Sequence, residues 1–180
     1  MVIDISLENI WDSWYAFRKG KRSCDELEEF TYYLERHLYS LYHDLQKGIY
    51  IHGGYRKFTV TDSKRRTISV ASIRDRIVHR LLYEYLVPIF DPRFIPDVWS
   101  CRKGKGLTGC ITRTYFLLKK YRDAWVWRGD IIKFFDHVDH EVLMTALERR
   151  VDDQTARRLL HEVIESYSLP RTRERERERE

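Results

Sequence analysis

One aspartate in the second half of the sequence has the surroundings that metal-dependent chemistry needs. Asp130 closes a stretch that starts with the apolar residues 125–127, and the aromatic pair Phe134 and Phe135 follows it. A carboxylate at the end of a strand can hold Mg²⁺ through hard oxygen contacts, because the buried strand fixes its position. An aspartate after a strand is also a common cap or turn residue, so the residue types alone leave both roles open.

Two basic stretches are the next feature that indicates a ligand. Residues 56–80 contain eight Lys or Arg against two Asp, a local net charge of +6. Residues 99–122 contain seven Lys or Arg and no acid, a local net charge of +7. Each Lys or Arg placed on a phosphate releases counterions, so such stretches suit a polyanion. A solvated basic face without a partner is the alternative.

The composition of the chain limits the classes to which it can belong. With 180 residues and a net charge of +5, the chain can bury one substantial core, as one domain or part of one. Cys24, Cys101 and Cys110 match no zinc or redox spacing, and we expect free thiols in a reducing cytoplasm. Residues 1–12 have no basic segment followed by an apolar one, and no apolar run has the length of a membrane span. We therefore expect neither secretion nor membrane insertion.

Hydrophobic spacing predicts the elements that would position these groups. Apolar residues at steps of three and four predict helices over residues 7–18, 27–45, 73–88, 107–121, 141–150 and 153–166, with Gly48 as the stop of the second. β-Favouring residues around a polar turn predict a hairpin with a basic tip over residues 53–72. Residues 124–132 are predicted as a strand that ends near Asp130. Together these elements indicate an α+β fold.

The last residues differ in kind from the rest. Residues 171–180 are Arg and Thr followed by a strict Arg-Glu alternation without an apolar residue, so they cannot contribute to a core. We expect a low-complexity tail over residues 169–180. A biological tail, a shift of reading frame and a cloning artefact are all compatible with this composition.

Several segments together resemble one enzyme family. The stretch GDIIKFFDHVDHEVL, residues 129–143, resembles motif A of bacterial reverse transcriptases, in which an Asp precedes Phe-Phe-Asp and a following Asp-His. The resemblance runs from about Trp11 to Ser166 and includes RKGKR (18–22), GGYRKFTVTDSKRRTISVASIRDRIVHRLL (53–82), PIFDPRFIPD (88–97) and WSCRKGKGL (99–107). The sequence of these segments is most similar to the reverse transcriptases of diversity-generating retroelements. The enzymes of group II introns and retrons are relatives of that group.

This resemblance assigns expected roles around Asp130. It implies that Asp130 is the first catalytic aspartate, that the Ile131 carbonyl is a further metal contact, and that two Mg²⁺ ions would act in the complete enzyme. Phe135 aligns with the aromatic residue that excludes a ribose 2′-hydroxyl, which implies a preference for deoxynucleotides. Lys133 and Phe134 would line the same nucleotide pocket. A plain core role for Phe134 is the alternative.

The basic residues receive expected roles in the same way. Lys64, Arg65 and Arg66 at the hairpin tip would bind the nucleotide triphosphate, since planar bidentate donors suit phosphate oxygens. We expect Ser72 to cap the next helix and Asp75 to hold an arginine. The predicted nucleic-acid contacts are Arg74, Arg76, Arg80, Arg102, Lys103 and Lys105.

The resemblance also implies an architecture and binding partners, and it shows that one motif of the family is missing from the sequence. The expected parts are a helical region (1–52), the fingers and the start of the palm (53–122), and a partial palm with motif A (123–168). The family implies an RNA template, a DNA or RNA primer, dNTPs and, for the retroelement subgroup, a small basic accessory protein. The aromatic-x-Asp-Asp motif that supplies the other carboxylates is missing from the sequence, so we expect that this chain alone does not polymerise. A non-catalytic nucleic-acid-binding module and a helical interaction protein are the alternatives.

Overall fold

The structure, a computed structural model, describes residues 1–61 and 65–167, apart from the side chain of Asp136. It divides into two compact units, which are described separately. The first unit comprises Met1–Leu86 together with the chain from Val138 onward, and the second comprises Val87–His137. No helix in the described ranges is both long and apolar enough to cross a membrane.

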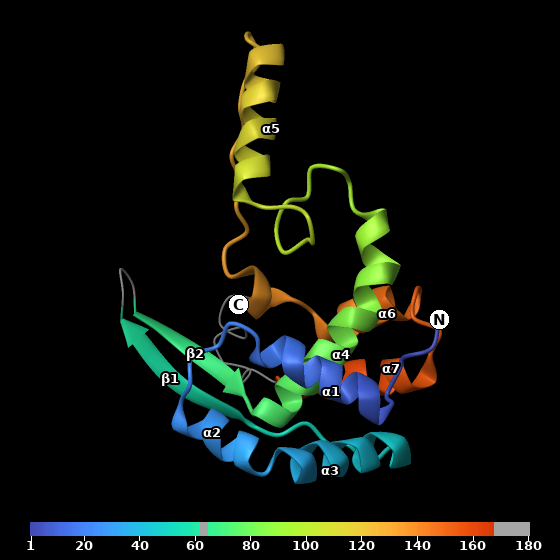
Figure 1. The fold of residues 1–180 in the computed structure, drawn as a ribbon. Helices are drawn as coiled ribbons and strands as arrows, with labels where there is room; N and C mark the ends of the chain where they lie inside the picture. The colour runs from blue at the N-terminus through green and yellow to red at the C-terminus, as the bar shows by residue number, and fades with distance from the viewer. Residues whose placement is uncertain (62–64, 168–180) are drawn as a thin grey trace, which may run out of the picture. The chain divides into compact units, whose positions relative to one another are not determined.

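The first unit is mostly helical and carries one hairpin (Figure 1). Its chain order is α1, α2, α3, β1, β2 and the start of α4, followed after the second unit by α6 and α7. The bounds are α1 Leu7–Arg18, α2 Asp25–Tyr32, α3 Leu34–Lys47, β1 Tyr55–Thr61, β2 Arg65–Ala71, α4 Ile73–Phe90, α6 His140–Glu148 and α7 Gln154–Ser166.

Capping residues account for the starts of α1 and α7 and for the end of α3. Ser6 caps α1 by accepting the Asn9 N–H at 3.2 Å, and Asp153 caps α7 by accepting the Ala156 N–H at 2.7 Å. Gly48 ends α3 with φ of +70°, a left-handed conformation that glycine adopts without strain. The predicted stop at Gly48 is therefore confirmed.

Two predicted helix boundaries are wrong. The single helix expected over residues 27–45 is interrupted at Tyr33, which has φ of −105° and ψ of 27° and separates α2 from α3. The apolar spacing continues across the interruption, so hydrophobic periodicity could not reveal it. Helix α4 was expected to end at Pro88 but continues to Phe90. A proline inside a helix removes one backbone hydrogen bond without always ending the helix.

The core of the first unit joins helices that are distant in the sequence. Fully buried aliphatic side chains come from α1, α3, α4 and α7, and include Ile10, Leu41, Ile77 and Leu159. Helix α1 packs against α3, and α6 packs against α7. Burying a side chain of this size contributes about 1.5–3 kcal/mol. The C-terminal helices therefore help to fix the same core from which the hairpin emerges.

The predicted hairpin is confirmed, and its register defines two faces. Strands β1 and β2 are antiparallel, with Tyr55 opposite Ala71 and Thr61 opposite Arg65. Because side chains alternate along a strand and opposite residues share a face, one face is mostly polar. The other face carries Arg56, Phe58, Val60, Arg66, Ile68 and Val70.

The second unit contains less regular structure than expected. Its elements are the end of α4, the short 3-10 helix η1 (Asp91–Arg93), α5 (Leu107–Lys120) and the 3-10 helix η2 (Phe134–His137). The strand predicted over residues 124–132 is not formed. A strand needs a neighbour to bond its backbone N–H and C=O groups, and in the described residues the only sheet is the β1–β2 pair.

Candidate nucleic-acid interface

The hairpin presents arginines beside an apolar strip. Arg65 and Arg66 are both exposed at the start of β2, and Lys64 lies outside the described residues. Phe58, Val60 and Ile68, on the same face as Arg66, are 38–42% exposed although they are large and apolar. An apolar strip next to guanidinium groups can contact the bases and the phosphates of a nucleic acid together.

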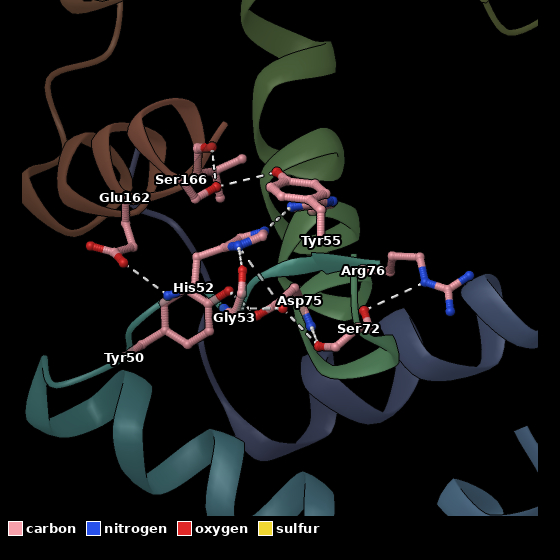
Figure 2. A network of polar contacts seen from close by, with 11 residues as sticks. Tyr50, His52, Gly53, Tyr55, Ser72, Asp75, Arg76, Glu162 and Ser166 are labelled. Atoms are coloured by element: carbon pink, nitrogen blue, oxygen red, sulfur yellow. Dashed lines mark hydrogen bonds and ion pairs between the residues drawn. The ribbon is translucent and has the colours of Figure 1, made fainter. Parts of the chain in front are cut away.

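A buried carboxylate at the base of the hairpin fixes the way the strands leave the core. Asp75, in the first turn of α4, is 1% exposed. It accepts hydrogen bonds from Tyr50 Oη at 2.7 Å, from Gly53 N at 3.2 Å and from Ser72 Oγ at 2.7 Å. Figure 2 shows these groups converging on the carboxylate. Three donors compensate for the cost of burying the charge.

The Asp75 carboxylate also affects its neighbours. Burial and the hydrogen bond to Asp75 raise the pKa of Tyr50 far above its usual value, so its hydroxyl remains a donor. A Cβ added to Gly53 would lie 2.9 Å from Asp75 Oδ2, so glycine allows the backbone to approach the carboxylate. Ser72 Oγ accepts the Asp75 N–H at 3.2 Å, which confirms Ser72 as the helix cap. The expectation that Asp75 holds an arginine was wrong, because its oxygens bind these three donors instead.

Two histidines extend the network beneath the hairpin. His52 Nε2 lies 3.0 Å from His79 Nε2, and His52 Nδ1 contacts the carbonyl of Gly53. A carbonyl only accepts, so His52 Nδ1 carries a proton, and one of the two facing Nε2 atoms donates a hydrogen bond to the other. Burial first, and His52 second, lower the pKa of His79 below its usual value.

The same network reaches the last helix. Glu162 on α7 accepts the His52 backbone N–H at 2.8 Å, and Tyr55 Oη lies 3.2 Å from Ser166 Oγ (Figure 2). The start of β1 is therefore bonded both to α4 and to a helix more than a hundred residues away in the sequence. Sequence reasoning missed His52, His79 and Glu162, because their spacing in the chain carries no recognisable motif.

The predicted nucleic-acid arginines on α4 are partly engaged within the fold. Arg74 forms a 2.6 Å ion pair with Asp44, and both side chains are about three-quarters buried. Arg76 pairs with Glu26 at 3.3 Å, and Arg80 pairs with Glu84 one turn later in the helix. The side chains of Arg74 and Arg76 are similarly buried, at 27% and 29% exposed, and the ion pair of Arg74 is the shorter of the two.

The predicted basic loop of the second unit is organised by one arginine. Arg102 Nε and Nη2 donate to the two Asp91 carboxylate oxygens at 2.7 and 3.0 Å, and Nη2 also donates to the Asp91 carbonyl. The Arg102 guanidinium lowers the pKa of Asp91. Lys105 donates to the Pro96 carbonyl and lies over the Trp99 ring, whereas Lys103 is exposed. Arg102 therefore holds the loop together, and Lys103 is the most accessible of the three predicted cations.

The motif A segment of the second unit is extended and exposed. Trp125 is 100% exposed and Trp127 is 89% exposed, and Asp130 and Ile131 are exposed as well. Lys133 has φ of +49°, and the rings of Phe134 and Phe135 meet edge to face at 5.4 Å. Phe135 is 86% exposed and Phe134 is 51% exposed, so neither is a core residue of this unit.

The groups near Asp130 fit a divalent metal only in part. A carboxylate oxygen has the chemistry that Mg²⁺ prefers. Among residues 1–61 and 65–167, no group of three or more His, Cys, Asp or Glu is arranged to hold a metal ion. Asp139, which follows Asp130 in the sequence but belongs to the first unit, caps α6 by accepting the N–H groups of Glu141 and Val142 at 2.9 and 3.1 Å. The donor type suits Mg²⁺, but the described donors are too few for a two-metal site.

Comparison with known proteins finds similarity but no matching family profile. Protein YkfC of Escherichia coli strain K12 is 29% identical over 109 residues, which cover 59% of this chain and 29% of that protein. Nuclear intron maturase 1, mitochondrial, of Arabidopsis thaliana is 32% identical over 81 residues, covering 45% of this chain and 11% of that protein. An uncharacterized 91 kDa protein in the cob intron of Schizosaccharomyces pombe is 27% identical over 109 residues, covering 61% of this chain and 13% of that protein.

These matches are partial in both directions. The matched region spans less than a third of the length of each of these relatives. Two of the three are named for introns, one of them as a maturase. At this low identity, the matches support a relation of the chain to reverse-transcriptase-related proteins.

Proposed function

We propose that this chain is part of an RNA-directed DNA polymerase and contributes the RNA-binding fingers and the first catalytic aspartate. The observation that carries the proposal is the pair Arg65 and Arg66, exposed on a hairpin whose base is bonded to the core through Asp75. A hairpin whose base is bonded to the core and whose other end carries exposed arginines is suited to hold phosphates in a fixed position. The resemblance of the segment around Asp130 to motif A is the reason for assigning the phosphates bound by the hairpin to a polymerase reaction.

In the complete enzyme, the fold would be the fingers and part of the palm of a right-hand polymerase. Two Mg²⁺ ions would supply the electrostatic stabilisation of phosphoryl transfer when the other carboxylates are present. Asp130 would bind metal, Phe135 would select deoxynucleotides, and the hairpin arginines would orient the triphosphate. An RNA template, a primer and dNTPs are the implied substrates.

The subgroup is a finer part of the proposal. The sequence of the fingers segments favours an enzyme of a diversity-generating retroelement, and this subgroup implies a small basic accessory protein as partner. The intron-related matches fit a broader group that includes intron enzymes. Binding assays with and without such an accessory protein would separate the two assignments, since only the first expects a tight complex.

We further propose that the chain alone binds nucleic acid without polymerising. A single carboxylate cannot clamp both the attacking and the leaving oxygen. The experiment measures two quantities on one substrate, a labelled DNA primer annealed to an RNA template. The expected result is binding that weakens with salt, and no primer extension when Mg²⁺ and dNTPs are added.

Two results would contradict this proposal. Absence of binding at low salt would remove the nucleic-acid function and favour a helical interaction protein. Metal-dependent extension that is abolished by Asp130→Ala would show that the chain needs no further carboxylates. Extension that persists in Asp130→Ala would indicate a contaminating polymerase, and the preparation would then be repurified before the measurement is repeated.

A further inference from the structure

One side of α5 carries large aliphatic side chains that are open to solvent. Leu107, Ile111 and Leu118 are 77%, 58% and 51% exposed. They are spaced by four and seven residues, so they lie on the same face of a helix with 3.6 residues per turn. The structure describes every residue of α5, and none of them is buried. This aliphatic face of α5, defined by the three residues, is therefore uncovered in the described chain.

The other side of α5 is cationic. Arg113 and Lys120 are seven residues apart and lie roughly opposite the aliphatic face, and Lys119 lies at the boundary between the two sides. The helix contains no Asp or Glu. Arg113 pairs with Asp97 at 2.9 Å, whereas the two lysines are exposed and form no ion pair with a described residue. Two uncompensated cations therefore accompany the aliphatic face.

The net charge of the chain lies in the second unit. Val87–His137 contains ten Lys or Arg against five Asp, a net charge of +5, which equals that of the whole sequence. An anionic partner of the aliphatic face is therefore favoured by charge complementarity. A second copy of the chain is disfavoured, because it would bring two such units against each other.

The chemistry of the exposed side chains distinguishes a lipid surface from a nucleic acid. Leu107, Ile111 and Leu118 have no ring that could stack on a base, so a nucleic acid would leave them in water. Acyl chains would remove them from water, which is favourable. Trp125 and Trp127 of the same unit are 100% and 89% exposed. Indole rings are enriched where lipid headgroups meet acyl chains.

We propose that α5 binds the surface of an anionic lipid bilayer, with the aliphatic face toward the acyl chains and the lysines on the phosphate headgroups. Amphipathic helices with cations on the polar side and large apolar residues on the other lie in this way in the plane of the interface. Lysine stems are long enough to reach the headgroups while the helix is partly immersed. The helix would lie on the bilayer without crossing it, since α5 has 14 residues. The inference does not depend on polymerase activity or on the hairpin.

The test measures co-sedimentation of the full chain with lipid vesicles at low salt. One set of vesicles contains phosphatidylcholine and phosphatidylglycerol in equal parts, and the other contains phosphatidylcholine alone. Ile111→Ser/Leu118→Ser removes two residues of the aliphatic face. Ile49→Ser/Ile51→Ser is its matched control, because these isoleucines are 56% and 73% exposed and lie outside α5. Circular dichroism checks that both variants keep the helix content of the wild type.

The wild type is expected to bind the anionic vesicles and to bind the neutral ones much more weakly. Ile111→Ser/Leu118→Ser should lower the partition coefficient by roughly tenfold or more, because two aliphatic side chains no longer leave water. Lys119→Ala/Lys120→Ala should lower it on anionic vesicles by about fivefold for each lysine. Ile49→Ser/Ile51→Ser and the α3 variant Arg36→Ala/Lys47→Ala should bind as the wild type does.

Three results would overturn the proposal. One is equal binding of the wild type to both kinds of vesicle, or no binding to either. Another is an equal effect of the α5 variants and their controls. The last is self-association of the wild type in analytical ultracentrifugation that Ile111→Ser/Leu118→Ser abolishes, which would assign the aliphatic face to a second copy.

Two further measurements separate this surface from the proposed function. Arg65→Ala/Arg66→Ala should leave vesicle binding unchanged, because the hairpin belongs to the other unit. Ile111→Ser/Leu118→Ser should bind the labelled primer–template as the wild type does. Weaker primer–template binding by this variant, together with unchanged vesicle binding, would overturn the lipid surface in favour of a nucleic acid.

Discussion

The buried carboxylate of Asp75 can be tested by replacing it with asparagine, which has nearly the same shape. Asparagine keeps one oxygen and replaces the other with an NH₂ group, which only donates. Tyr50 Oη bonds one carboxylate oxygen, and Gly53 N and Ser72 Oγ bond the other. Whichever way the amide points, at least one buried N–H or O–H loses its acceptor.

The magnitude follows from the number of bonds that are lost. A buried donor without an acceptor costs about 1–3 kcal/mol, and hydrogen bonds to a charged acceptor contribute about 1.5–3 kcal/mol. We therefore expect Asp75→Asn to lower the free energy of unfolding by about 3 kcal/mol. That loss is a large share of the roughly 5–15 kcal/mol that stabilises an ordinary domain.

Equilibrium unfolding in urea, followed by circular dichroism, measures this change. Asp12→Asn is the matched control, because Asp12 is an exposed aspartate in the middle of α1. The control should change the free energy of unfolding by less than about 0.5 kcal/mol. A loss in Asp75→Asn as small as that of the control would refute the role assigned to the network.

Three further outcomes follow from named groups. Burial lowers the pKa of His79 in the folded protein, so as pH falls below about 6.5 the histidine is protonated in the unfolded chain before it is protonated in the folded one. The free energy of unfolding should therefore decrease below this pH, and it should decrease less steeply in His79→Gln. Equal pH profiles of the two proteins in urea titrations would contradict this. Gly48→Ala should lower the free energy of unfolding by about 1 kcal/mol because of its φ of +70°, and an unchanged thermal midpoint would count against it. Arg102→Ala should raise the pKa of Asp91, which an NMR titration of its carboxyl carbon can follow, and no upward shift would mean that the guanidinium is not its main partner.

Local signals in the sequence predicted most elements of the first unit. Helix α1 follows from its apolar stripe, the end of α3 from Gly48, and the hairpin from β-favouring residues around a polar turn. Each of these depends on residues close together in the chain. The interruption at Tyr33 was missed because the apolar spacing does not change there.

Long-range contacts could not be predicted in this way. The partners of Asp75 include Tyr50, which is 25 residues away, and His52 bonds Glu162 across 110 residues. The strand expected near Asp130 failed for a related reason, since a strand depends on a neighbour and not only on its own residues. Residue type identified Arg74, Arg76 and Arg102 as cations, but only the structure shows how each is paired.

The most direct test of the central claim is the salt dependence of RNA binding by the hairpin. Arg65→Ala/Arg66→Ala should bind single-stranded RNA more weakly than the wild type, and its slope of log K against log salt should be smaller by about 1.4. Arg36→Ala/Lys47→Ala, with the same loss of charge on α3, should keep the wild-type slope. An unchanged affinity and slope in the hairpin variant would contradict the claim that the β1–β2 hairpin holds nucleic-acid phosphates.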